Sequence, residues 1–257
     1  MNIIAYGGGT NSTAMIIEML HRQMPIDLIL FADTGGEKDQ TYDFIETFNQ
    51  WLYHHDLVIT MVKGQQPQQV KDGGLYEECM RLGVLPSRVY GRGGCSMKWK
   101  RDPVEFYVRH LPEAKAIVKT GQKLNKYIGY DADEPHRADR PHFDNDPVYK
   151  HHFPLIDWDW GRDECVSCIE KAGLPQPGKS ACFFCPSMKQ HEIRELAVTN
   201  PEQMVKALQM EENAQDKLTS IKGLGRQFSW GNLIATDDMF PENYGLQEMP
   251  CDCFDGE

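Results

Sequence analysis

The fold class is decided by the opening stretch Ile3-Ile4-Ala5-Tyr6-Gly7-Gly8-Gly9-Thr10-Asn11-Ser12-Thr13, where an apolar run meets three consecutive glycines. Such a run is typical of a buried strand, and apolar residues at helical spacing from Ala14 to His21 predict a helix directly after the glycines. A second apolar run at 27–31 ends in Ala32-Asp33-Thr34-Gly35. Strand, glycine loop, helix and strand in this order predict a doubly wound, mostly parallel α/β sheet.

The glycine loop has the chemistry of a phosphate-binding site. Glycines let backbone N–H groups approach an anion without interference from a Cβ atom, and the start of the helix adds unpaired donors and its dipole. Ser12 and Thr13 add hydroxyl groups at the same place. The loop lacks the Lys-Ser/Thr ending of a Walker loop and the spacing of the dinucleotide motif, so a purely structural turn remains the alternative.

Apolar spacing predicts the remaining elements and a division of the chain. Helices are expected over 41–52, 75–82, 96–111, 162–172 and 191–218, and strands over 57–62 and 116–121. Near residue 150 the pattern changes from alternating strands and helices to helices joined by a proline- and glycine-rich link. We therefore expect an α/β nucleotide-binding core at 1–150 and a smaller, cysteine-containing helical lobe at 151–257.

The acidic balance of the chain limits its partners. The net charge of -11 argues against a large duplex-binding surface, because neutralising phosphates needs clustered lysines and arginines. Two short segments are nevertheless rich in cations: Arg88, Arg92, Lys98, Lys100 and Arg101 in one, Arg137 and Arg140 in the other. Each alone is typical of a solvated face, but beside glycines and a cysteine they favour a local anion pocket.

Neither a membrane span nor a secretory leader is expected. No apolar run approaches the roughly twenty residues that a bilayer-crossing helix needs. The first strand begins at once, without a basic region followed by an apolar stretch. We therefore expect a cytoplasmic protein, in which the eight cysteines are reduced thiols or metal ligands and form no disulfide framework.

Two C-x-x-C pairs suggest a metal site. Cys182-Phe183-Phe184-Cys185-Pro186 can bring two thiolates to one metal, and a following proline is common beside iron–sulfur ligands. Cys165 and Cys168 form a pair upstream, within a stretch that also reads as a helix. Three interpretations stay open. In the first, the two pairs bind structural zinc. In the second, an iron–sulfur cluster is held by Cys95, Cys182, Cys185 and a fourth thiol, for which we choose Cys165. In the third, the cysteines are buried thiols without a metal.

Several segments resemble motifs of one protein family. The loop at 7–14 is similar to the S-G-G-x-D-S-T PP-loop of the adenine nucleotide α-hydrolases, and 31–44 resembles the F-x-D-T-G-x-E-x-x-x-T-Y segment of phosphoadenosine phosphosulfate (PAPS) reductase-like proteins. Cys95-x-x-Lys98-x-Lys100-x-x-Pro103 resembles their C-x-x-K-x-x-P element. The stretch 129–137 resembles the loop G-x-R-x-x-E-x-x-R, and 179–186 resembles the C-x-x-C-P of the cluster-bearing branch.

The resemblance implies a Rossmann-like sheet that binds ATP or a PAPS-like adenine nucleotide, with Mg²⁺, at the carboxyl ends of its strands. The implied nucleotide-binding residues are Gly7, Gly8, Gly9, Asn11, Ser12, Thr13, Asp33, Thr34, Gly129 and Glu134. The implied catalytic residues are Cys95, Lys98 and Arg137, the last as a charge-assisted partner of an anionic oxygen. The implied cofactor is a [4Fe-4S] cluster, with Zn²⁺ as the alternative.

The chain also departs from the family pattern. Gly7 stands in place of the usual serine, Asn11 in place of the usual aspartate and Tyr130 where the loop often has arginine. The paired cysteines of the cluster-bearing reductases are reduced to Gly94-Cys95 here. The E-C-G-x-H segment that carries the reductases' nucleophile is missing, and the tail offers only the pair at 251 and 253.

These observations favour ATP-dependent sulfur transfer, or electron transfer, through a cysteine-bound cluster. Phosphoadenylyl-sulfate reduction is the first alternative, and a non-catalytic nucleotide-binding protein with structural zinc is the second. The expected partners are the nucleotide, a sulfur donor or thiol-reductant protein, and a second copy of the chain. A nucleic-acid substrate would need a partner protein or contact only the local basic pocket.

Overall fold

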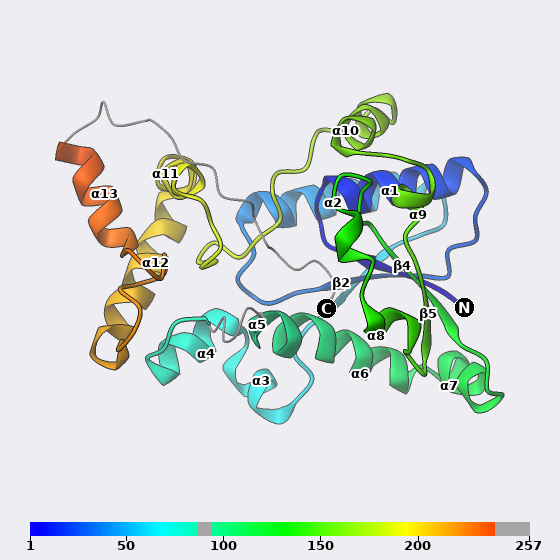
Figure 1. The fold of residues 1–257 in the computed structure, drawn as a ribbon, viewed down its shortest axis with the longest axis horizontal. Helices are drawn as coiled ribbons and strands as arrows, with labels where there is room; N and C mark the ends of the chain where they lie inside the picture. Colours follow the sequence, from blue (N-terminus) through cyan, green and yellow to red (C-terminus); the bar gives the residue numbers. More distant parts are fainter. Residues whose placement is uncertain (87–93, 240–257) are drawn as a thin grey trace.

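The computed structural model describes residues 1–86 and 94–239, and in them five strands form one parallel sheet (Figure 1). The strands are β1 (Asn2–Tyr6), β2 (Leu28–Ala32), β3 (Ile59–Val62), β4 (Leu124–Ile128) and β5 (Tyr149–His152). Their order is β3-β2-β1-β4-β5, and every neighbouring pair is parallel. The predicted parallel α/β sheet is confirmed. The chain winds from β1 to one edge, then returns to place β4 on the other side of β1.

Helices cover both faces of the sheet, as the apolar strands require. Side chains alternate along a strand, so Ile4 and Phe31 face a core formed with α1 (Thr10–His21), α2 (Asp39–Tyr53) and α10 (Arg162–Lys171). Ile3 and Leu30 face the opposite core, formed with α6 (Asp102–His110) and α7 (Pro112–Lys119). Figure 1 shows α1, α2 and α10 on one side of the sheet and α6 and α7 on the other.

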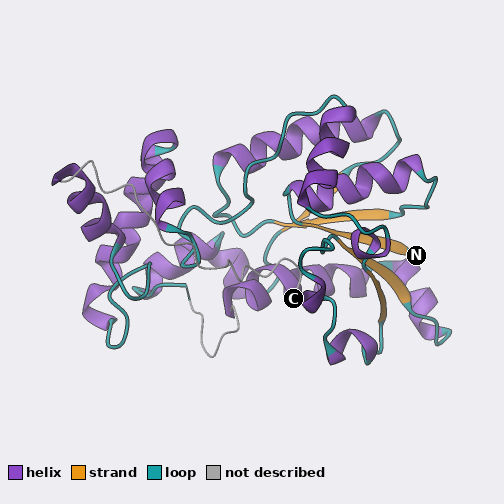
Figure 2. Cartoon of the chain, turned by 45° about the horizontal axis from the view of Figure 1, so that its top comes forward, coloured by secondary structure: helices purple, strands orange, loops and turns teal. Residues whose placement is uncertain are grey.

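A second group of helices packs beside the sheet (Figures 1 and 2). It contains α4 (Leu75–Leu82), α11 (Gln190–Thr199), α12 (Pro201–Ala214) and α13 (Trp230–Met239). These elements share a buried cluster around Trp99, Phe184 and Met210. Residues before and after position 150 therefore share both helical groups. The helix α4 packs with the C-terminal helices, and α10 packs on α1.

The predicted strand at 116–121 is wrong, because this segment lies in and just after the helix α7. A short apolar run fits a helix as well as a strand, and Pro112 at the first helical position favours the helix. Gly121 then turns the chain with a φ of 77°, and the strand begins at Leu124. The predicted helix at 191–218 is likewise divided, because Pro201 ends α11 and begins α12.

Three short helices and a π-helical turn lie in the segments before α6 and after β4. The turn η2 (Met97–Arg101) follows α5 (Gly94–Ser96) and leads into α6. The segment after β4 holds η3 (Pro135–Arg137) and α8 (Pro141–Asp144). Single π-helical turns are frequent at functional sites, so η2 and its cations bear on the site below.

The helices are short compared with a membrane span. Across residues 1–86 and 94–239, no helix is both long and apolar enough to cross a bilayer. The longest of them, α2, has 15 residues.

Candidate functional site

A cavity of about 390 Å³ opens at the carboxyl ends of β1, β2 and β4. Its floor is formed by strand ends, including Tyr6, Phe31 and Ile128. The strand order reverses between β1 and β4, and ligands of open α/β sheets bind in the crevice at such a reversal. The volume lies in the range of small-molecule sites, and the apolar floor suits a flat ring system.

The predicted glycine loop forms one wall of the cavity. Gly7, Gly9, Asn11 and Ser12 line it, where β1 passes into α1. The backbone N–H of Gly7 donates to Ser12 Oγ at 3.2 Å, which holds the loop closed on itself. The first turn of α1 therefore lines the cavity, and the N–H groups at a helix start are suited to binding an anion.

Gly129 allows the end of β4 to approach this loop. A Cβ atom at position 129 would lie 2.9 Å from the Cα of Ser12, closer than any real contact. Gly129 and the following loop residue Glu134 both line the cavity. The sequence-predicted loop at 129–137 therefore begins in contact with the glycine loop, and residues of both loops line the cavity.

Positive charge is concentrated around the cavity although the chain is acidic overall. Its described wall contains six cationic side chains: Lys100, Arg101, Lys126, Arg137, Arg162 and Lys179. Two carboxylates, Asp131 and Glu134, share the wall with them. An anionic ligand would be attracted to this site against the net charge of the whole chain.

Arg137 is held in place at the cavity wall. Its guanidinium donates to Glu134 Oε2 at 2.7 Å and stacks 4.3 Å from the ring centroid of Tyr130. Tyr130 is buried and stacks in turn on Phe153. A fixed, planar guanidinium is suited to bidentate binding of phosphate or sulfate oxygens.

Lys126 is a cavity residue that the sequence analysis overlooked. It lies in the middle of β4 and is only 7 % exposed, with its ammonium 4.9 Å from the ring centroid of Tyr149. Burial lowers its pKa, because the charged form is poorly solvated there. A lysine flanked within one strand by Leu124, Tyr127 and Ile128 was the available signal.

Asp131 is a second residue that the sequence analysis overlooked. Its Oδ2 accepts a hydrogen bond from the Asn11 amide at 2.6 Å, and Arg162 donates to the other end of that amide at 3.3 Å. Asp131 is 5 % exposed and lines the cavity. Burial raises the pKa of its carboxyl group, an effect that the hydrogen bond from Asn11 partly offsets.

The acidic turn after β2 supports the site from outside the cavity. Asp33 accepts from the Tyr42 hydroxyl at 2.7 Å and from the backbone N–H of Gly35 at 2.8 Å. Thr34 donates to Glu37 Oε1 at 3.1 Å. Neither Asp33 nor Thr34 lines the cavity, and the same holds for Gly8 and Thr13 of the glycine loop.

Glu37 connects this turn to the cysteines. It is 1 % exposed, and its Oε1 lies 3.2 Å from Lys100 Nζ and 3.7 Å from Cys182 Sγ. Cys182 also lies 3.2 Å from Thr34 Oγ1. Burial first and the Glu37 charge second raise the pKa of the Cys182 thiol, while Lys100 opposes the rise.

Three of the four predicted metal ligands lie in the same region of the molecule, without forming a metal-binding group. Cys95, Cys182 and Cys185 pack against the same buried cluster as Trp99 and Phe184. Cys182 and Cys185 form one tight turn, in which the Cys185 N–H donates to the Cys182 carbonyl at 3.0 Å. Within residues 1–86 and 94–239, no three His, Cys, Asp or Glu side chains are arranged to hold a metal.

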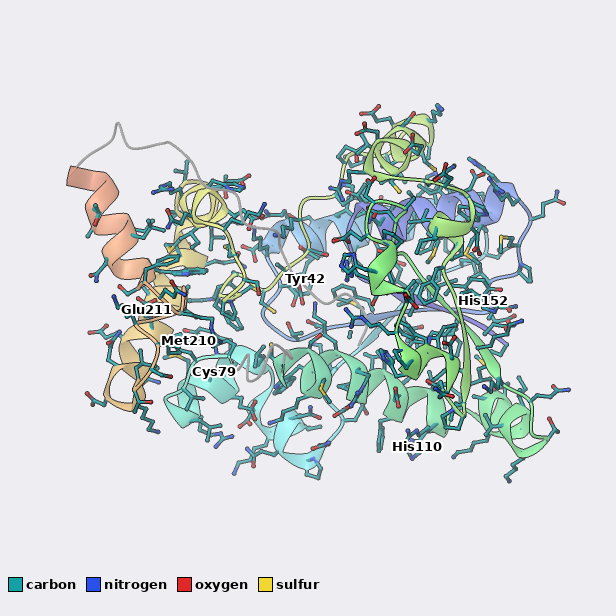
Figure 3. The ribbon with its side chains drawn as sticks, viewed as in Figure 1. Tyr42, Cys79, His110, His152, Met210 and Glu211 are labelled. Atoms are coloured by element: carbon teal, nitrogen blue, oxygen red, sulfur yellow. The ribbon has the colours of Figure 1, made fainter. Side chains whose placement is uncertain are left out.

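Cys165 is not brought to the other three cysteines. It lies on α10 in the core against α1, beside Cys168, and burial raises its pKa to about 12. A thiol that sequence analysis did not consider, Cys79 of α4, is instead buried in the cluster shared by Cys95 and Met210 (Figure 3). Cys251 and Cys253 lie outside the described residues.

Lys98 lies outside the cavity and forms an ion pair between two helical segments. It lies on η2 with its ammonium paired to Glu78 of α4, and it does not line the cavity. The indole N–H of Trp99 donates to the other oxygen of Glu78 at 3.0 Å. Glu78 thus fixes η2 against α4, and this in turn orients Lys100 toward the cavity.

Compared with known proteins, the chain matches no family model and no curated protein.

Proposed function

We propose that this chain is a PP-loop enzyme of the PAPS reductase-like group, which binds ATP or a related adenylate. The cavity at the strand-order reversal carries the proposal, because it combines a glycine loop, an apolar floor and six cations in an acidic protein. The apolar floor suits the adenine ring, and the glycine loop with its cations suits the phosphates. The C-terminal helices with their C-x-x-C turn would form the smaller lobe of such an enzyme.

The cationic wall suggests how bond cleavage at the α-phosphorus would be assisted. Arg137 is positioned by Glu134 and Tyr130, and Lys179 by Glu192 at 2.9 Å. When a substrate oxygen attacks the α-phosphorus, negative charge moves onto the departing pyrophosphate. Fixed cations stabilise that charge without reorganising, which is the usual source of rate enhancement in such sites.

The cysteine side of the site supports sulfur or electron transfer. The candidate ligands of an iron–sulfur cluster are Cys95, Cys182 and Cys185, since thiolates are its ordinary ligands. Their thiols would have to move together to hold one, because among the described residues they are not arranged around a metal position. Bound there, the cluster would supply an iron for carrying sulfide, or a path for electrons. Lys100 lies between the two regions, because it lines the cavity and pairs with Glu37 beside Cys182. ATP-dependent sulfur transfer is the version that we favour.

Two assays test this proposal. Protein purified without oxygen should contain about four irons and four acid-labile sulfides per chain. Cys182→Ala should lose them, while the matched variant Cys165→Ala keeps them. An ATP–pyrophosphate exchange assay with candidate sulfur acceptors should show turnover.

Stoichiometric zinc without iron would contradict the redox and sulfur-transfer chemistry and favour a structural metal site. Absence of exchange with every acceptor, in protein that binds ATP, would contradict activation at the α-phosphorus.

A further inference from the structure

Asp131 and Asn11 form a hydrogen-bonded pair in the cavity wall although 120 residues separate them in the chain. We propose that Asp131 supplies the carboxylate that binds the divalent cation of the bound nucleotide, a role for which the glycine loop offers only the neutral Asn11. The inference rests on the proposed nucleotide site and assigns one of its metal ligands.

The two oxygens of Asp131 have different surroundings. Oδ2 accepts the 2.6 Å hydrogen bond from Asn11, whereas Oδ1 is buried and has no partner at normal hydrogen-bond geometry among the described residues. A buried carboxylate oxygen without a partner costs free energy unless a ligand satisfies it. Since Asp131 lines the cavity and is 5 % exposed, that ligand would come from the cavity.

A buried carboxylate that does not line the cavity looks different in the same molecule. Asp33, also buried, has Oδ1 engaged by the Tyr42 hydroxyl and the Gly35 N–H, and Oδ2 lies 3.6 Å from Lys63. Both of its oxygens are therefore occupied by protein groups. Asp131 leaves one oxygen available at a site where phosphates are expected.

The orientation of Asn11 is fixed in a way that serves Asp131. Arg162 donates to Asn11 Oδ1 at 3.3 Å, so the amide nitrogen faces Asp131 and donates to it. An aspartate at position 11 would place two carboxylates at hydrogen-bond distance, where like charges repel. The amide avoids this repulsion and holds the Asp131 carboxylate in a single orientation.

The chemistry favours a small, hard cation. Carboxylate oxygens together with phosphate oxygens and water are the usual ligands of Mg²⁺ and Mn²⁺. Glu134 adds a second carboxylate to the same wall, already paired with Arg137. A dication at Asp131 would also compensate for the unfavourable burial of its charge.

The test uses Mn²⁺ as the probe, followed by electron paramagnetic resonance in the presence and absence of ATP. The variants are Asp131→Asn, Asn11→Asp and the exchange variant that carries both changes. Asp144→Asn is the matched control, because Asp144 is exposed on α8 and does not line the cavity. ATP binding in EDTA is measured for every protein by calorimetry.

Asp131→Asn should weaken Mn²⁺ binding in the ATP complex by about tenfold or more, while ATP binding in EDTA changes little. The exchange variant should recover Mn²⁺ binding, because it restores one carboxylate and one amide at the same pair of positions. Asp144→Asn should match the wild type. The exchange variant also keeps the test valid if either single variant folds poorly.

Two outcomes would overturn the inference in distinguishable ways. If the wild type binds ATP and Mn²⁺ together and Asp131→Asn does the same, Asp131 is not the ligand and the nucleotide site stands. If the wild type binds no ATP, with or without Mn²⁺, the proposed function fails and the cation site fails with it.

Discussion

Lys100 pairs with Glu37 at 3.2 Å and thereby links the cavity to the region around Cys182. The lysine lines the cavity, whereas the glutamate is buried beside Cys182. An anion in the cavity would compete with Glu37 for the same ammonium group.

The ion pair between Lys100 and Glu37 should contribute to the free energy of unfolding. Lys100→Met should lower the free energy of unfolding by about 2 kcal/mol, because it leaves the buried Glu37 charge without its counterion. The partial exposure of Lys100 keeps the expected loss below that of a fully buried pair. Glu37→Gln in the same background should recover most of the loss. Urea unfolding of the four proteins gives the coupling energy. Additive effects of the two substitutions would contradict a direct pairing.

The second prediction concerns Lys126. Burial lowers its pKa, so the unfolded chain binds this proton more tightly than the folded protein does. Lys126→Met should therefore raise the free energy of unfolding at neutral pH, by about 1 kcal/mol, and weaken ATP binding at the same time. The gain in stability should shrink as the pH rises toward the ordinary lysine pKa, where the unfolded chain also loses the proton.

Urea unfolding at several pH values, with wild type and variant compared at each, measures this effect. Lys150→Met serves as control, since Lys150 is exposed on the neighbouring strand β5. A stability difference that is independent of pH would show that packing, and not the charge, is responsible.

The third prediction concerns the second helical group. The buried Glu211 of α12 accepts hydrogen bonds from the backbone N–H groups of Leu224, Trp230 and Gly231. Glu211→Ala would leave several donors without a partner and should lower the free energy of unfolding by about 3 kcal/mol. Glu212→Ala, at the exposed neighbouring position, should change it little. Figure 3 shows Glu211 on the helix that faces α4. A loss below about 1 kcal/mol would contradict an anchoring role.

The sequence was sufficient for the fold class and for the first three strands, because their signal is local, whereas β4 and β5 were not predicted. The runs ending at Tyr6 and Ala32 are strongly apolar and each leads into a turn and a helix, so strand and loop could be predicted together. The run at 116–121 carries no such context, and its apolar residues suit one side of α7 equally well. Short apolar runs do not distinguish the two states without the neighbouring packing.

The candidate site was predictable only where its residues belong to a continuous motif. The glycine loop and the C-x-x-C turn follow from local spacing, and the loop at 129–137 follows from its resemblance to a family motif. The partnership of Asn11 with Asp131 depends on the approach of β4 to β1, which no local pattern contains. The same applies to Cys165, because only tertiary packing separates α10 from the other cysteines.

Calorimetric titration with ATP and with PAPS determines whether the cavity binds a nucleotide, on which the proposed chemistry and the cation site both depend. At least one nucleotide should bind, and Arg137→Ala should weaken the binding by about tenfold or more, since it removes a charge-assisted bond. Arg109→Ala, which removes an exposed arginine of α6 outside the cavity, should not. Binding of neither nucleotide to the wild type, or equal binding to all three proteins, would contradict nucleotide binding in this cavity.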